Sequence, residues 1–122
     1  MCQIRERQVG SYTSCGHGAG LGVLHPFYYR HICEAGRKKF ARFASQVWGI
    51  SSEGKTEEGL AKAGVEALAA FIREIGLPTT LRELGVTEQT DLKEIAGSCP
   101  IMPGSYKRMT HGEILAIFKE CF

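Results

Sequence analysis

The sequence has 122 residues, of which 43% are hydrophobic and 23% charged, and its formal net charge is +2. A chain of this size can bury a core as one domain, 1–122, and its low net charge argues against nucleic acid or an anionic membrane as a partner. It contains neither an apolar run of bilayer length nor a signal-peptide core, which predicts a cytoplasmic protein.

The first quarter of the chain predicts two helices joined by a loop. Residues 1–9 are expected to form the end of a helix, and the Ser, Thr and Gly residues of 10–16 predict a loop. A second helix is expected over about 18–33, and its apolar run 21–29 should be buried. Pro26 has no N–H to donate to residue 22, so it should bend this helix or break its hydrogen-bond ladder.

An amphipathic helix is predicted over 37–48, ended by Gly49. Its apolar residues recur at helical spacing and should face the core: Phe40, Phe43, Ala44, Val47 and Trp48. Its opposite face is basic, with Arg37, Lys38, Lys39 and Arg42. Such a face would suit DNA, but basic helix faces are usually solvated and the net charge is low, so no nucleic-acid partner is expected.

A long helix should follow the polar loop 51–55. Thr56 is a good N-cap, and Gly76 followed by Pro78 ends the helix in the usual way. The residues expected on its buried stripe are Leu60, Gly64, Ala67, Leu68, Phe71, Ile72 and Ile75. Many of its residues are small, which would let a neighbouring helix approach closely.

Short helices are predicted for the last third of the chain. Thr80 and Glu83 form a capping box before a helical turn that ends at Gly85, and Thr87 should cap another short helix. Two prolines and a glycine make 99–106 irregular. A second capping box, Thr110 to Glu113, should begin the last helix, whose buried face is Ile114, Ile117, Phe118 and Cys121. Because no segment shows two-residue alternation, the fold class is predicted to be all-α, a multi-helix bundle.

Cysteine and histidine spacing gives little evidence for a self-contained metal site. None of the five cysteines forms a C-x-x-C pair, so all are expected to be reduced thiols that pack as small hydrophobes. His17 and His25 lie eight residues apart, about 12 Å along a helix, and no histidines stand at i, i+4. His25, His31 and His111 are expected to be structural. His17 lies among four glycines at the start of the apolar helix, so another backbone or a ligand, such as a metal or an anion, could approach closely.

Several motifs resemble one family over nearly the whole chain. They are Gly10-Ser11-Tyr12-Thr13, His17-Gly18-Ala19-Gly20-Leu21, Pro26, Tyr29-Arg30, Arg42-Phe43-Ala44, Val47-Trp48-Gly49-Ile50, Ile75 to Leu81 and Thr110 to Leu115. In their order and spacing they resemble the C-terminal helical domain of the iron-containing alcohol dehydrogenases, in the butanol dehydrogenase branch. The resemblance implies a dehydroquinate synthase-like helical bundle, Fe²⁺ or Zn²⁺ and NAD(P)H as cofactors, and a small alcohol or aldehyde as substrate.

The resemblance also implies a ligand set that this chain does not reproduce. In the family, one Asp and three His hold the metal, which polarises the substrate carbonyl while a nicotinamide delivers hydride. His17 matches the last of these ligands. The preceding ligand lies in an H-x-x-x-H pair, fourteen residues before His17, where this chain has Gln3, and the second histidine of that pair is replaced by Arg7. Arg cannot coordinate a metal near neutral pH, and Gln is a poor ligand for such metals. The Asp, the first His and the nucleotide-binding domain would precede Met1.

Two interpretations therefore remain open. In the first, the chain is the C-terminal metal-binding domain or a fragment of an alcohol dehydrogenase, and the isolated chain binds metal and NAD(P)H poorly and is inactive. In the second, it is a free-standing, non-catalytic helical module that binds or interacts with a partner. The apolar run 21–29 leaves self-association into a homo-oligomer open in either case.

Overall fold

The computed structural model describes residues 2–122, except for the side chains of Gln3 and Ile4. This part of the chain forms six α-helices, a short 3-10 helix and no strand, which confirms the prediction of an all-α fold. In order, the elements are α1 (Cys2–Tyr12), α2 (His17–Ile32), α3 (Arg37–Gln46), α4 (Glu57–Glu74), η1 (Arg82–Leu84), α5 (Leu92–Ser98) and α6 (His111–Glu120). No helix among the described residues is long and apolar enough to cross a membrane.

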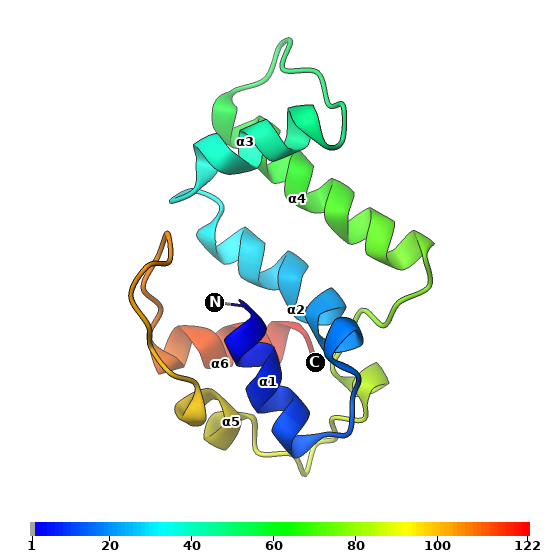
Figure 1. Ribbon diagram of the computed structural model, residues 1–122, viewed down its shortest axis with the longest axis vertical. Helices are drawn as coiled ribbons and strands as arrows, with labels where there is room; N and C mark the ends of the chain where they lie inside the picture. The colour runs from blue at the N-terminus through cyan, green and yellow to red at the C-terminus, as the bar shows by residue number, and fades with distance from the viewer. Residues whose placement is uncertain (1) are drawn as a thin grey trace.

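The helices gather into two groups joined by α2 (Figure 1). Helices α3 and α4 pack against each other at one end of the molecule, while α1, α5 and α6 lie together at the other. Helix α2 passes between the groups and contacts α1, α4 and α6. Its first residue, His17, therefore has a position set by the packing of both groups.

The C-terminal helix supplies the centre of the core. The four residues expected on its inner face are fully buried: Ile114, Ile117, Phe118 and Cys121. The backbone N–H of Leu81 donates a hydrogen bond of 2.7 Å to the carbonyl of Cys121, which holds the segment before η1 against the end of α6. Leu81 is itself buried, so this hydrogen bond is shielded from water.

Several helix boundaries differ from the sequence-based predictions. Helix α1 continues to Tyr12 instead of ending at residue 9, and Thr13 then donates its N–H and its hydroxyl to the carbonyl of Val9. Helix α2 begins at His17 and continues through Pro26, where the ladder lacks the one hydrogen bond that proline cannot donate; burial of its apolar residues outweighs this loss. Helix α3 ends at Gln46, which leaves Val47 exposed.

Capping of α5 was also predicted at the wrong residue. Thr87 pairs with Thr90 in a turn, and the cap of α5 is Asp91, whose carboxylate accepts hydrogen bonds from the N–H groups of Lys93 and Glu94. Both residue types cap helices well, so the sequence alone does not choose between them.

The buried stripe of α4 is rotated relative to the prediction. Phe71 and Ile75 are 43% and 52% exposed, whereas Ala61, Val65 and Ala69 are buried. Helix α4 packs against both α3 and α2, and its contact with α3 is close at Gly64. A Cβ atom at Gly64 would lie 2.8 Å from the Cβ and 3.0 Å from the Cα of Ala44. This contact confirms the expectation that small residues let a neighbouring helix approach.

The substitution Gly64→Ala should therefore destabilise the fold. The added methyl group would force α3 and α4 apart, at a cost of about 1–3 kcal/mol in unfolding free energy. The matched control is Gly97→Ala in α5, where an added Cβ meets nothing within 4 Å. Urea unfolding followed by circular dichroism measures both, and an unchanged midpoint for Gly64→Ala would contradict the close contact.

The capping box of α6 forms as predicted. Thr110 accepts a hydrogen bond from the N–H of Glu113, and the Glu113 carboxylate accepts one of 2.9 Å from the N–H of Thr110. Lys107 contacts the same carboxylate at 2.7 Å. The Lys107 ammonium, followed by the Thr110 N–H, lowers the pKa of Glu113 to about 2. The folded state thus stabilises the ionised Glu113 carboxylate relative to the unfolded state.

This depressed pKa predicts a pH-dependent contribution to stability. The contribution is fully present above the ordinary Glu pKa of about 4.3 and is lost as the pH falls toward about 2, because the unfolded chain takes up the proton first. Glu113→Gln should lower the melting temperature at pH 7 and have a much smaller effect near pH 2, where the carboxylate of the folded protein is largely protonated. The loop variant Glu53→Gln serves as the control, and equal effects of Glu113→Gln at both pH values would contradict the prediction.

Candidate functional site

His17 begins α2 and lies at an open position. The His17 side chain is 47% exposed. The N-cap residue of α2 is Gly16, which has no side chain to cap the helix. At Gly18 an added Cβ would meet nothing within 4 Å, so another molecule has space to approach here. The start of α2 therefore keeps the accessibility that the glycine-rich sequence predicts.

At the next two glycines, other parts of the fold approach α2, which is one of the two possibilities that the sequence left open. These glycines do not leave open space beside His17, because each faces another part of the fold. A Cβ at Gly22 would pack 3.6 Å from Leu77, and a Cβ at Gly20 would lie 2.6 Å from Oε1 of Glu6. Of the three glycines that follow His17 in alternation, only Gly18 faces open space.

Glu6 is the residue of this site that the sequence analysis missed. It lies on α1, is only 2% exposed, and its carboxylate contacts Nδ1 of His17. Its burial was detectable in principle, because Cys2, Glu6 and Val9 recur at the spacing of one helix face and all three are buried. A carboxylate on the inner face of a helix requires a partner, and His17 is that partner.

The ligand set implied by the resemblance is not assembled by the described residues. Arg7 is exposed on α1, and the side chain of Gln3 lies outside what the structure describes. Within the described part of the chain, no three His, Cys, Asp or Glu side chains are grouped so that they could hold a metal ion. The described residues therefore do not fit a complete metal site. Of the ligand set that the resemblance implies, they supply a match only at His17.

The other three histidines lie elsewhere and have local partners. His25 stacks on Tyr29 with ring centroids 5.0 Å apart, and His31 contacts the Glu120 carboxylate at 3.1 Å. His111 donates from Nε2 to the carbonyl of Cys99 at 3.0 Å. These contacts agree with the structural roles expected from the sequence.

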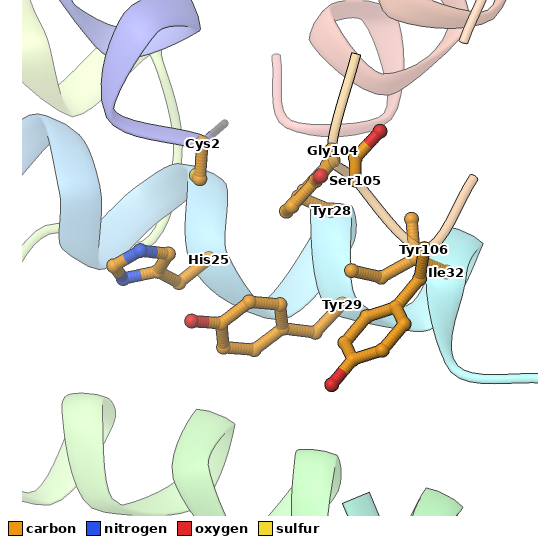
Figure 2. A pocket seen from close by; sticks show the side chains of 8 residues that line it. All are labelled: Cys2, His25, Tyr28, Tyr29, Ile32, Gly104, Ser105 and Tyr106. Atoms are coloured by element: carbon orange, nitrogen blue, oxygen red, sulfur yellow. The ribbon is translucent and has the colours of Figure 1, made fainter. Parts of the chain in front are cut away.

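A separate hollow of about 710 Å³ opens beside the middle of α2 (Figure 2). A second hollow of about 420 Å³ continues it toward α3, and the two share His25, Tyr29, Ile32 and Tyr106. Figure 2 shows the rings of His25 and Tyr29 projecting from α2, with Tyr106 of the loop before α6 beside them. The remaining walls are Cys2, Tyr28, Gly104 and Ser105 in the first hollow, and Lys39, Phe40, Phe43 and Leu68 in the second.

The first hollow is lined by side chains that are uncharged at neutral pH. Burial lowers the pKa of the His25 imidazole and raises the pKa of the Cys2 thiol to about 12. Burial also raises the pKa values of Tyr28 and Tyr29. Such a lining suits an uncharged ring better than an ion. Its width depends on Gly36, because a Cβ there would lie 2.9 Å from the Tyr106 ring.

Comparison with known proteins shows which family the chain belongs to. The family model described as "Fe-containing alcohol dehydrogenase family, C-terminal" matches residues 5–122. The chain therefore belongs to the Fe-containing alcohol dehydrogenase family and corresponds to its C-terminal part.

Individual relatives agree with this assignment. NADH-dependent butanol dehydrogenase B of Clostridium acetobutylicum is 29% identical over 96% of this chain and 31% of its own length. 1,3-Propanediol dehydrogenase of Citrobacter freundii is 30% identical over 94% of this chain and 30% of its own. The crystal structure of a 1,3-propanediol oxidoreductase superposes with a TM-score of 0.90 and 28% identity, covering 99% of this chain and 32% of that one. The chain thus spans about a third of the length of the relatives it matches.

The accessibility of the thiols gives a direct test of the packing around this site. All five cysteines are free, and Cys15 is the one that is not buried. Burial raises the pKa of Cys2 to about 12 and of Cys99 to about 11, so these thiols should react slowly. Ellman's reagent should titrate one thiol quickly in the native protein, and Cys15→Ser should remove that phase. A fast phase that survives in Cys15→Ser would contradict the packing.

Proposed function

We propose that the chain acts as the C-terminal, metal-binding part of an iron-dependent alcohol dehydrogenase. The oxidoreductase would work in the cytoplasm and interconvert small primary alcohols and aldehydes, with NAD(P)H as the hydride donor and Fe²⁺ or Zn²⁺ as the metal. His17 would supply one metal ligand. The observation that carries the proposal is the half-exposed His17 ring at the start of α2, in a fold that matches the family over residues 5–122.

The same structure limits what the isolated chain can do. One ligand is not enough to hold a catalytic ion, and the described residues include no group of three His, Cys, Asp or Glu side chains that could form the site. The chain also has no glycine-rich dinucleotide motif after a strand, since its described part contains no strand. Catalysis would therefore require further polypeptide of the kind that makes up the rest of the relatives, and we expect the isolated chain to be inactive.

A graft tests this proposal. Residues 1–122 would replace the corresponding third of the Clostridium acetobutylicum butanol dehydrogenase, with anaerobic reduction of butyraldehyde by NADH in the presence of Fe²⁺ as the assay. The unmodified graft should be inactive, because Gln3 replaces a ligand, and Gln3→His should restore turnover. Adding His17→Ala to the restored graft should abolish it again. The isolated chain should show no turnover in the same assay.

The outcomes of the graft separate the two interpretations. A folded graft that stays inactive with Gln3→His would contradict the dehydrogenase proposal. Activity of the unmodified graft would support the function but show that Gln3 is not an obstacle. Activity that survives His17→Ala would remove His17 from the site.

A non-catalytic binding module is the second candidate, and the hollow beside α2 favours it. Its neutral aromatic walls would accept an uncharged ring, and the half-buried His25 offers a ring nitrogen for a hydrogen bond. Titration with phenol, with benzoate as the charged control, should then shift the NMR signals of His25 and Tyr29 for phenol alone. No shift with phenol would leave this candidate without support.

A further inference from the structure

The environment of Glu6 is unusual for a carboxylate. It is almost fully buried on α1, next to the first turn of α2, while its partner His17 is nearly half exposed. A buried carboxylate is strongly unfavourable unless it is paired and hydrogen-bonded, so the contact with His17 satisfies a requirement of Glu6. The half-exposed imidazole can hydrogen-bond to water and does not depend on Glu6 in this way. The two side chains of the pair therefore differ in exposure: the carboxylate is buried, and the imidazole reaches solvent.

Glycines on both helices make the space in which the carboxylate lies. A Cβ at Gly20 would lie 2.6 Å from Oε1 and 2.7 Å from Cγ of Glu6, closer than a methyl group can come. A Cβ at Gly10, one turn after Glu6 on α1, would lie 3.6 Å from the same oxygen. The carboxylate is thus held by the crossing of α1 and α2 and cannot easily move away from His17.

The contact sets how the imidazole ring is turned. Nδ1 of His17 faces Oε2 of Glu6, so Nε2 lies on the opposite side of the imidazole. An ionised carboxylate can only accept a hydrogen bond, and beside one Nδ1 carries the proton and leaves the lone pair on Nε2. Histidines that bind metals are commonly held in this way, with the second nitrogen donating to a carboxylate.

We propose that Glu6 is a positioning residue for His17: its buried carboxylate selects the Nδ1–H tautomer and turns Nε2 away from the carboxylate. The importance of this arrangement for a metal rests on the proposed function. The arrangement itself is a property of α1 and α2 and exists without any metal. It also gives Gly20 a specific role, because the glycine is what admits the carboxylate beside the ring.

The experiment compares two glycine substitutions in the same helix. Gly20→Ala would displace the Glu6 carboxylate without changing either partner, whereas Gly18→Ala adds the same methyl group where nothing lies within 4 Å. Long-range ¹⁵N–¹H NMR at pH 8.5, two units above the ordinary imidazole pKa of about 6.5, reports which ring nitrogen carries the proton. The wild type and Gly18→Ala should show His17 as the Nδ1–H form alone. Gly20→Ala should lose this single form and show both tautomers.

A second variant keeps the proposal testable if Gly20→Ala does not fold. Glu6→Met keeps the length of the side chain and removes the acceptor, and it should release the same mixture of tautomers. A folded Gly20→Ala or Glu6→Met that retains the pure Nδ1–H form would overturn the proposal, as would a wild type that already shows both tautomers.

The two proposals can fail separately. A tautomer result as expected, together with an inactive Gln3→His graft, would keep Glu6 as a positioning residue and reject the dehydrogenase function. An active graft, together with an unaltered His17 tautomer in Glu6→Met, would keep the dehydrogenase function and reject Glu6 as a positioning residue.

Discussion

Burial of α2 is the constraint on which the rest of the fold depends. Val23, Leu24, Tyr28 and Ile32 are all almost fully buried, and each such side chain contributes about 1.5–3 kcal/mol relative to exposure. They place α2 against α1, α4 and α6, so that this one helix holds both groups of helices together. The same burial explains why the helix continues through Pro26. It also fixes the position of His17, because the first residue of a rigid, packed helix has little freedom to move.

Local signals in the sequence predicted the elements well. Thr56 caps α4, Thr110 and Glu113 form their capping box, and Gly76 and Gly85 have the positive φ values expected after helical segments. These features depend on residues close together in the chain, which is why they can be recognised without a structure. The all-α class follows from the same periodicity.

Contacts between distant segments were not predictable in the same way. The buried stripe of α4 depends on how α4 packs against α3 and α2, and spacing along α4 alone cannot show this. Glu6 was overlooked for the same reason, since a glutamate on an amphipathic helix is normally assigned to solvent. Its role becomes visible only when Gly20 and His17 are seen beside it. The sequence therefore predicted one residue of the candidate site, His17, from its motif. The carboxylate partner Glu6 could be identified only from the packing of α1 against α2.

The relation between Gly36 and the hollow beside α2 has an evolutionary consequence. Gly36 does not line the hollow, yet the absence of a side chain there allows the Tyr106 ring to lie where it forms a wall. Any residue with a Cβ at position 36 would push the ring aside and alter the width of the opening without changing a single lining residue. One substitution outside the hollow can thus change the width of its opening over evolutionary time, while every residue that lines it stays the same.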